Sequence, residues 1–536
     1  MTTSSFQDRV APPGTATAGW TAALTASAAS GLALGVLFPR FGWDWLAWVA
    51  LVPLFIVIAR ARGAWQAFWG GYLAGFLFFA LSCPWIATTI HHYGDLSRPI
   101  AAVVFVLFLL LMGSYLGLFA VLGYWLGNSL GHRLVPLPFL WVAVEWFRTY
   151  TPMGGFPWNL LGYSQYQHAG FMLVVPWTGI YGASLLIALA NTCVAALLLH
   201  RARRTATLAL PAIGLVLILG FATLPYHPPA ALPRPLRARL VQPNTALGLN
   251  WTSSTLNTFL QTQERLSTPP GTPPVNLILW PEQPAPLNFE LQPQFQRMSA
   301  RLLDATHAAF LFEEVSYPLS ALGVPNYHQP RNSAQLINAD GTIGPRYDKM
   351  HLVPFGEYDP LPAWIASLGG VGKLVQDVSD FVPGSAPALL PLGPHRFAVM
   401  ICYESIFPAL ARHNVAQGAE FLVNLSDDSW YGNSSAAPQG LMMAQVRAME
   451  NRRWLLRDTD NGITAVIDPY GRVTASLPRF TSGVLDASFA PSSALTFYTR
   501  HGDWLAFACL LAAAALALYG LGRSLWKKKN HQRLNP

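Results

Sequence analysis

Three short segments of the chain carry side chains that together can perform acyl transfer. Trp280-Pro281-Glu282 supplies a carboxylate, Tyr347-Asp348-Lys349 supplies an ammonium group, and Ile401-Cys402 supplies a thiol. A thiol becomes a good nucleophile when a base removes its proton, and fixed positive charge stabilises the oxyanion that develops after attack. Glu, Lys and Cys are therefore the minimum set for acyl transfer through a thioester.

Cys402 stands apart from the other three cysteines, which fall inside long apolar runs. It is the only thiol in the more polar stretch 228–500. Such a thiol has no disulfide partner within its own region, so it is either a buried structural cysteine or a reactive one. Taken singly, Glu282 is typical of an ordinary acid at a strand end and Lys349 of a surface charge. Their joint occurrence with Cys402 favours catalysis.

The elements that must position these groups have the pattern of an α/β fold. Apolar runs typical of buried strands end just before Glu282 and Cys402, and stretches with helical spacing alternate with them. Alternation of this kind predicts helices that cover a sheet, with reactive groups at strand ends. The expected strands are 238–241, 275–280, 310–315, 333–338, 396–401 and 421–426, the expected helices are 257–266, 295–306 and 436–453, and 462–468 with 471–474 is typical of a hairpin.

The rest of the chain has the composition of a membrane protein. Of its 536 residues, 52% are hydrophobic and 11% are charged, with a mean hydropathy of +0.32, whereas an average soluble protein is about 25% charged. A membrane helix needs roughly 20 apolar residues. The pattern predicts about eight transmembrane helices, the fifth being the weakest, over residues 19–38, 42–59, 64–90, 99–127, 134–150, 168–199, 205–224 and 503–522.

Lys and Arg are unevenly distributed among the short loops that join these spans. With the N-terminus in the cytoplasm, the inside loops hold ten of them and the outside loops only Arg40, Arg98 and Arg148. Positive residues favour the cytoplasmic side, so the polar region is expected outside the cytoplasm. The net charge of +8 then reflects membrane anchoring, and no basic patch laced with aromatic residues indicates nucleic acid.

The expected layout is a cytoplasmic tail at 1–18, a membrane domain with seven transmembrane helices at 19–227, an extracytoplasmic catalytic domain at 228–500, an eighth transmembrane helix at 501–523 and a basic cytoplasmic tail at 524–536.

Several motifs make the chain resemble a known family. The order Glu, Lys, Cys on an α/β sandwich is similar to the nitrilase (carbon–nitrogen hydrolase) superfamily. Longer motifs over about residues 20–523 resemble the apolipoprotein N-acyltransferase family. In the polar region they are Trp280 to Glu282 (WPE), Leu352 to Tyr358 (LVPFGEY), Ile401 to Glu404 (ICYE), Asn424 to Ser426 with Ser429 to Gly432, and Asn461 to Ala465; in the apolar region they are Glu145 to Arg148 (EWFR), Gly155 to Trp158 (GFPW) and Gly162 to Gln165 (GYSQ).

The resemblance implies a role for each polar group of the candidate site. Cys402 is expected to be the nucleophile, Glu282 the general base and Lys349 the stabiliser of the oxyanion. Physical chemistry is consistent with this, because a carboxylate that follows a buried strand is partly desolvated and its pKa rises toward the range of a useful base.

Supporting roles are implied for three neighbours. Glu357 is expected to be a second essential glutamate that orients the lysine or assists proton transfer, since the glycine before it permits a tight bend. The backbone N–H of Tyr403 is expected to add to the oxyanion hole. For Glu404 a functional role and a purely structural hydrogen-bonding role are equally open.

A loop at 358–383 is rich in large apolar residues and glycine but lacks clean periodicity. Exposed apolar surface in a loop often marks a ligand or membrane contact, and such loops often act as lids. We interpret it as an arm that dips toward the bilayer and admits acyl chains, with a short core-packing helix as the alternative. Trp364, Trp430 and Tyr431 are the residues expected at this substrate entrance.

The expected fold is a multi-span α-helical membrane domain joined to an extracytoplasmic α/β nitrilase-like αββα sandwich. By resemblance, the enzyme takes an acyl chain from a phospholipid onto a cysteine thioester. It then transfers the chain to the α-amino group of the N-terminal diacylglyceryl-cysteine of an apolipoprotein. No cofactor or metal is expected, and the location implied is the bacterial inner membrane with the catalytic domain on the periplasmic side. The alternatives are a membrane-tethered amidase with the same triad, a transporter or receptor with a dead sensor domain, and an inactive relative.

The sequence departs from the family pattern close to the site. Asp427, Asp458 and Asp460 stand where the family usually has other residues, two of them asparagines, and they add negative charge near strand ends. The triad is intact, so the departures bear on the preferred headgroup or acceptor. Within the apolar half, Glu145 is a functional candidate because ionisable residues in spans are rare, and Arg148, one turn later, is its expected partner.

Overall fold

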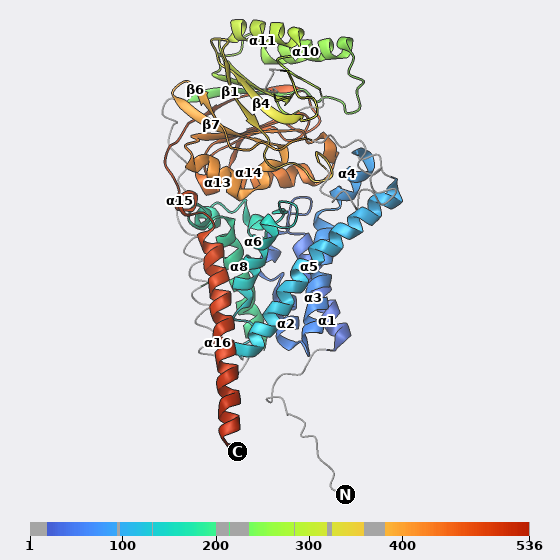
Figure 1. The fold of residues 1–536 in the computed structure, drawn as a ribbon, viewed down its shortest axis with the longest axis vertical. Coiled ribbons are helices and arrows are strands. Elements are labelled where there is room, and N and C mark those ends of the chain that lie inside the picture. Colours follow the sequence, from blue (N-terminus) through green and yellow to red (C-terminus); the bar gives the residue numbers. More distant parts are fainter. Residues whose placement is uncertain are drawn as a thin grey trace.

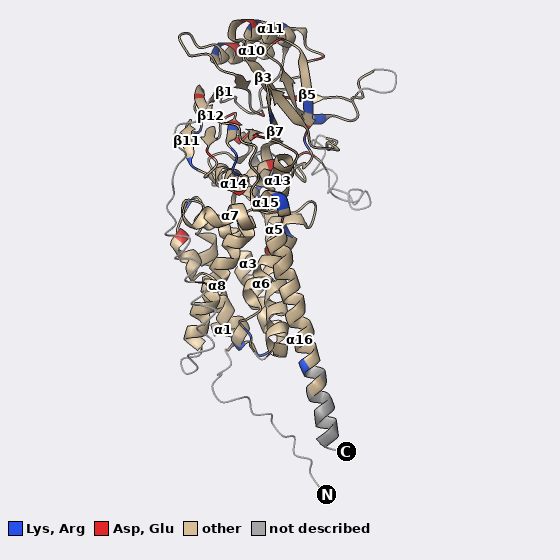
Figure 2. Cartoon of the chain, turned by 90° about the vertical axis from the view of Figure 1, so that its left-hand side faces the viewer, with Lys and Arg blue, Asp and Glu red and all other residues tan. Residues whose placement is uncertain are grey.

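The computed structural model describes residues 19–93, 97–130, 132–199, 214, 235–282, 285–318, 324–358 and 381–534. The chain folds into two parts stacked along its long axis (Figure 1). One, the helical half, comprises residues 19–199 and 504–534; the other, the sandwich half, comprises residues 235–489. Figure 2 shows most charged residues on the sandwich half and few on the helices beneath it.

The helical half contains long and short helices in close succession. Its α-helices are α1 (Trp20–Gly35), α2 (Val52–Arg60), α3 (Ala64–Ser82), α4 (Trp85–Tyr93), α5 (Arg98–Leu130), α6 (Leu137–Tyr150), α7 (Val175–Thr178), α8 (Ile180–Leu199) and α16 (Trp504–Leu534), and its 3₁₀ turns are η1 (Asp44–Trp48), η2 (Leu161–Gln165) and η3 (Phe171–Val174).

Among the described residues, four helices are long and apolar enough to cross a membrane: α3, α5, α8 and the part of α16 up to Arg523. The other predicted spans are shorter or interrupted, and span 205–224 lies outside the described residues. The predicted span 64–90 ends as one helix at Ser82 and restarts at Trp85, because Pro84 between them has no N–H to continue the helical bonds. Chain breaks of this kind are invisible to a count of apolar residues.

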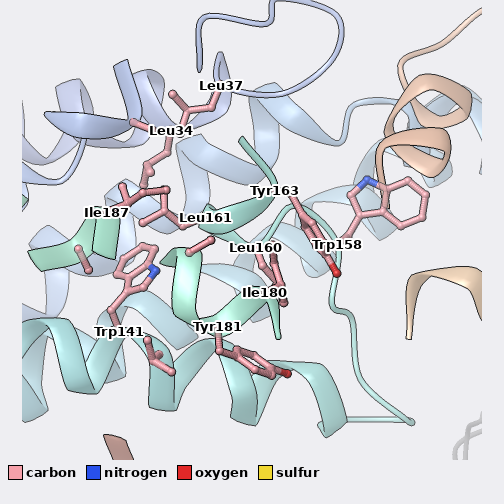
Figure 3. Close-up of a cluster of buried hydrophobic side chains, with 14 of the residues drawn as sticks. Leu34, Leu37, Trp141, Trp158, Leu160, Leu161, Tyr163, Ile180, Tyr181 and Ile187 are labelled. Atoms are coloured by element: carbon pink, nitrogen blue, oxygen red, sulfur yellow. The ribbon is translucent and has the colours of Figure 1, made fainter. Parts of the chain in front are cut away.

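The contact between α3 and α5 depends on small residues. A Cβ atom on Gly71 would lie within 2.1 Å of the Leu116 carbonyl oxygen, and one on Gly75 would lie 3.1 Å from the Gly113 Cα. Glycines let helix backbones approach closely, which gains dispersion contacts where lipid offers no hydrophobic driving force. The core beyond this contact is aromatic as well as aliphatic, with Trp141, Tyr163 and others labelled in Figure 3.

Glu145 and Arg148 do not form the expected ion pair. The Leu161 N–H donates to Glu145 Oε1 at 2.6 Å, whereas Arg148 Nη1 donates to the carbonyl oxygens of Phe156 and Trp158 at 2.7 and 2.9 Å. Both buried side chains thus hold the same loop after α6 by its backbone. The prediction considered only helical spacing and missed these backbone partners.

The sandwich half has four layers, which confirms the predicted αββα sandwich. Two six-stranded sheets, ordered β12-β1-β2-β3-β4-β5 and β11-β10-β9-β8-β7-β6, face each other across an apolar core. The outer layers are α10 (Ser253–Ser267) with α11 (Pro293–Thr306), and α13 (Pro408–Ala416) with α14 (Ala436–Asn451), the latter pair facing the helical half (Figure 1). The strands are β1 (Leu236–Gln242), β2 (Leu277–Leu279), β3 (Ala309–Ser316), β4 (Arg331–Ile337), β5 (Ile343–Asp348), β6 (Leu389–Leu392), β7 (His395–Ile401), β8 (Phe421–Ser426), β9 (Leu455–Thr459), β10 (Ala465–Ile467), β11 (Val473–Ser476) and β12 (Gly483–Phe489), and the short elements are η5 (Cys402–Ile406), η6 (Ser429–Tyr431) and α15 (Phe497–His501).

Helix α14 joins the two halves through buried hydrogen bonds. Trp158 Nε1 donates to Gln439 Oε1 at 2.6 Å, and Gln439 Nε2 donates to the Ser82 carbonyl at 3.0 Å. At the other end of α14, the Ile180 N–H donates to Glu450 Oε1 at 2.8 Å. These bonds fix the sandwich half on the helices, so the strand ends described next have a defined position relative to the helical half.

Candidate active site

The three predicted catalytic residues come together where strands of both sheets end. Glu282 follows β2, Lys349 follows β5, and Cys402 begins η5 directly after β7. Cys402 has a φ of 52°, in the left-handed region that residues other than glycine seldom adopt. Strained backbone of this kind concentrates at functional sites, where the surrounding structure holds it in place.

Lys349 lies between two carboxylates. Its Nζ donates to Glu357 Oε1 at 2.6 Å and to Glu282 Oε1 at 3.3 Å. Asn332 on β4 bonds the same two oxygens, its Nδ2 lying 2.9 Å from Glu282 and 3.2 Å from Glu357. The Asp427 N–H donates to the other oxygen of Glu282 at 3.0 Å. Glu282 is therefore held on both oxygens, and Glu357 contacts the lysine directly, which is the geometry that an orienting group needs.

Burial and charge set the protonation of this group. Burial alone lowers the pKa of Lys349, but the charges of Glu282 and Glu357 outweigh it and hold that pKa well above its ordinary value. The pKa of Cys402 is also raised well above its ordinary value, first by burial and next by the charge of Glu282, with Lys349 acting in the opposite direction. The resting site thus holds a neutral thiol beside a carboxylate that can accept its proton, and a permanently charged ammonium group.

Glu404 has the contacts of a structural residue. It is fully buried, and it accepts hydrogen bonds from the Tyr347 hydroxyl and from the N–H groups of Met350, His351 and Ile401, at 2.8 to 3.0 Å. Those donors flank Lys349 on one side and Cys402 on the other. This pattern favours the structural alternative, in which Glu404 ties the end of β5 to the turn that carries the nucleophile.

The neighbouring aromatic residues face the helical half. The Tyr403 hydroxyl donates to the Gly155 carbonyl at 3.2 Å. The Tyr431 ring lies edge-on to Trp85 at 5.3 Å between centroids, and Trp430 is exposed. The structure thus places Tyr431 against the helical half, and its role at a substrate entrance stays a prediction. Trp364 and most of the predicted arm lie outside the described residues.

Asp427, Asp458 and Asp460 are all buried at the ends of β8 and β9. These strands are parallel with Ser426 opposite Thr459, so the next residues, Asp427 and Asp460, are also opposite one another. Burial and then the charge of Asp460 raise the pKa of Asp427 well above its ordinary value, and burial raises the pKa of Asp460 to about 7. The negative charge expected from these departures is therefore reduced, because the pair retains protons near neutral pH.

The Asp427–Asp460 pair leads to a prediction about stability and pH. The pKa of Asp460 rises from 3.8 to about 7 on folding, so between these values unfolding releases a proton and stability falls as pH rises. We expect the Tm in detergent to be higher at pH 5 than at pH 8. The Asp460→Asn variant should show a smaller difference, by at least about 2 °C. An unchanged difference in that variant would contradict the assignment.

Asn332 and Tyr347 are the site residues that sequence reasoning missed. Tyr347 stands beside the lysine in the Tyr347-Asp348-Lys349 segment but was given no role there, and Asn332 belongs to no motif; their positions on β5 and β4 reveal both. No simple sequence signal marks them, because each has polar neighbours on both sides in the sequence. Among the residues that the structure describes, no three His, Cys, Asp or Glu side chains are arranged to hold a metal ion.

An αββα sandwich with Glu, Lys and Cys at converging strand ends defines the class of carbon–nitrogen hydrolases. In agreement, the family model Carbon-nitrogen hydrolase matches residues 237–495, and the model Apolipoprotein N-acyltransferase N-terminal domain matches residues 30–193.

Relatives of known name match nearly the whole chain. The apolipoprotein N-acyltransferase of Geobacter metallireducens is 34% identical over 94% of this chain and 95% of its own, and that of Pseudomonas aeruginosa PAO1 is 34% identical over 91% and 93%. The Azotobacter vinelandii protein of the same name is 33% identical over 95% and 96%. Among solved structures, an amidase from Nesterenkonia sp. is similar over 52% of this chain and 98% of its own, with 20% identity and a TM-score of 0.37. The chain belongs to the apolipoprotein N-acyltransferase family.

Proposed function

We propose that this protein transfers an acyl chain from a phospholipid, through a thioester on Cys402, to the α-amino group of an N-terminal diacylglyceryl-cysteine. Family membership supports lipoprotein N-acylation as the reaction, and the membrane as its place. The single observation that carries the chemistry is the buried arrangement of Lys349 between Glu282 and Glu357, next to a thiol on strained backbone. To this reaction the proposal adds the phospholipid as the acyl donor and a chemical role for each residue of the site.

In the first half-reaction, Glu282 accepts the Cys402 proton as Sγ attacks the ester carbonyl carbon of the phospholipid. The carbonyl oxygen becomes an oxyanion, and Lys349 Nζ and the Tyr403 N–H stabilise it. When the tetrahedral intermediate collapses, the C–O bond to the glycerol oxygen breaks and Glu282 returns its proton to that oxygen. A lysophospholipid leaves, and the acyl chain remains on Sγ as a thioester. General acid–base catalysis of this kind contributes about 10²–10⁴-fold to a rate.

In the second half-reaction, the free amine of the diacylglyceryl-cysteine attacks the thioester carbonyl. Glu282 accepts a proton from the attacking nitrogen, the same donors stabilise the second oxyanion, and the C–S bond breaks. The thiolate then recovers the proton from Glu282, which restores the starting state. A thioester suits this step because it keeps the acyl group reactive toward amines while the first product departs.

The helical half accounts for access to both substrates, since each is anchored in a bilayer. We infer an orientation in which the sandwich half lies outside the cytoplasm, as the ten-to-three bias of Lys and Arg in the loops favours. In this arrangement the protein lies in the bacterial inner membrane and α13 and α14 face the bilayer surface. The amidase alternative, with water as the acceptor, is weaker because it gives no role to the apolipoprotein N-acyltransferase domain that matches residues 30–193.

Mass spectrometry of the purified protein after incubation with a phospholipid tests the proposal. The expected result is a mass gain of one acyl group on Cys402, labile to hydroxylamine and discharged by a diacylated lipopeptide to give a triacylated one. The Cys402→Ala variant is the control and should gain nothing. An adduct discharged only to water would support the hydrolase instead, and no adduct at all would contradict both.

A further inference from the structure

A cavity of about 430 Å³ lies at the junction of the two halves, next to the candidate active site. Its walls come from the loop after α1, from the break between α3 and α4, and from the segment that joins η6 to α14. The described residues that line it include Arg40, Trp85, Thr88, Tyr431, Asn433 and Ser435, and none of the described ones is Asp or Glu. The volume falls in the range typical of small-molecule sites, roughly 300–1,000 Å³.

Tyr431 is the wall that this cavity shares with the catalytic centre. One side of its ring contacts Trp85. Burial raises the pKa of Tyr431 well above its ordinary value, and the next largest cause is the charge of Cys402, followed by those of Asp428 and Glu282. The tyrosine therefore lies within electrostatic reach of the nucleophile and the base. The cavity and the surroundings of Cys402 thus have Tyr431 in common.

Arg40 supplies the cavity with a positive charge. Its guanidinium Cζ lies 5.6 Å from the Phe41 ring centroid, and it takes part in none of the ion pairs found in the described part of the chain. Behind the cavity wall, Arg479 donates to the carbonyl oxygens of Gly432 and Ser434. The acids that act on Tyr431, Asp428 and Glu282, are not among the described residues that line the cavity, whereas Arg40 is, so this lining favours an anion.

The start of α14 adds donors to the same cavity. Ser435 is the N-cap of this 16-residue helix, yet its hydroxyl makes no capping bond. The hydroxyl of the preceding residue, Ser434, accepts the Ala436 N–H. The Ser435 side chain lines the cavity in a residue that is only 7% exposed. An unused hydroxyl at a helix N-terminus, where N–H groups and the helix dipole attract negative charge, is typical of phosphate sites.

We propose that this cavity binds the phosphate group of the acyl donor. Arg40 pairs with the phosphate oxygens, and the Ser435 hydroxyl donates to them. The inference rests on the proposed function and adds to it a subsite. In a glycerophospholipid the phosphate is one glycerol unit away from the ester carbonyl, and the cavity has Tyr431 in common with the surroundings of Cys402. The acceptor, a diacylglyceryl-cysteine, carries no phosphate at its lipid. The subsite therefore acts in the first half-reaction and has no role in the second.

Kinetics of the two half-reactions test the proposal with Arg40→Gln. Formation of the acyl-enzyme is followed with a phospholipid and with a neutral diacylglycerol donor in the same micelles, and discharge of the preformed acyl-enzyme is followed with a diacylated lipopeptide. Loss of one charge-assisted contact should raise the apparent KM for the phospholipid about tenfold or more. The neutral donor and the discharge step should be unchanged. Arg40→Lys should recover part of the loss, and Arg301→Gln, at an exposed arginine on α11, should have no effect.

Competition by inorganic phosphate shows whether the cavity binds free phosphate as well as the phosphate group of a lipid. If it competes with the phospholipid in the native chain and not in Arg40→Gln, the cavity accepts a free phosphate as well as the lipid phosphate. If it does not compete while the KM effect persists, the cavity accepts only the phosphate carried by a lipid. An Arg40→Gln variant that slows both donors equally, or neither, overturns the subsite. Failure of the proposed function is a different result, in which the native chain forms no acyl-enzyme.

Discussion

The Lys349→Met variant is expected to form acyl-enzyme about 10²–10³-fold more slowly than the native chain, the usual cost of losing one oxyanion donor. It should also be less stable, by about 3–5 kcal/mol, because two buried carboxylates lose their common cation. The structure gives the reason: Lys349 is 1% exposed and bonds both Glu282 and Glu357. Methionine matches the length of the side chain, so the change removes charge with little change of volume.

A double variant separates the two effects of Lys349→Met. In Lys349→Met/Glu357→Gln one of the orphaned carboxylates is neutral, so the Tm in detergent should recover in part. The rate of acyl-enzyme formation, measured by mass spectrometry at short times, should not recover, since the oxyanion still lacks its cation. Recovery of the rate together with the Tm would show that Lys349 acts only as a structural cation, and would contradict its catalytic role.

Much of the sandwich half was predictable because its central strands are buried on both faces. A strand such as β7 then appears in the sequence as a continuous apolar run, and the polar residue that follows it, here Cys402, marks the strand end. The same logic located Glu282 after β2. Lys349 was a different case, because β5 is largely exposed and its sequence has no apolar run. Only its motif, together with the other two residues, indicated it.

The helical half was less predictable because an apolar stretch indicates burial in lipid or protein but does not indicate whether one unbroken helix runs through it. Helix α6 has 14 residues and α2 has nine, although both lie in runs that hydropathy treats as spans. Buried polar contacts were also out of reach. Glu145 and Arg148 have the spacing of a helical pair, but the loop after α6 offers both of them backbone groups, and no sequence pattern encodes that choice.

The position of the site between two separate sheets explains why its supporting residues escaped prediction. Glu282 and Lys349 come from one sheet and Cys402 from the other. Residues that register one sheet against the other, such as Glu404 with Tyr347, must bond across the interface. Their partners are distant in sequence and carry no catalytic chemistry. The motif therefore identified the reacting groups, whereas the groups that hold them at bonding distance became visible only in three dimensions.

The Glu282→Gln variant is expected to lose activity while its thiol becomes easier to ionise. Without a base to accept the Cys402 proton, acyl-enzyme formation should slow by about 10²–10⁴-fold at neutral pH. The charge of Glu282 is, after burial, the largest cause of the raised pKa of Cys402, whereas Lys349 lowers that pKa. Removing the carboxylate charge should therefore shift the thiol pKa downward, and the pH midpoint of iodoacetamide alkylation should move to lower pH.

These opposite changes distinguish a base from a residue that merely supports the fold. A misfolded or loosened site would also lose activity, and by exposing the thiol it would lower the Cys402 pKa too, because burial is the largest cause of that raised pKa. The shift of the midpoint is therefore assigned to the lost charge only if Glu282→Gln keeps the Tm of the native chain in detergent. Glu282→Asp is the matched control: it keeps the charge, so it should keep the high midpoint and lose rate only through the shorter reach of its carboxylate. If Glu282→Gln instead alkylates with the midpoint of the native chain, the carboxylate does not act on Sγ, and the assignment of Glu282 as the base is wrong.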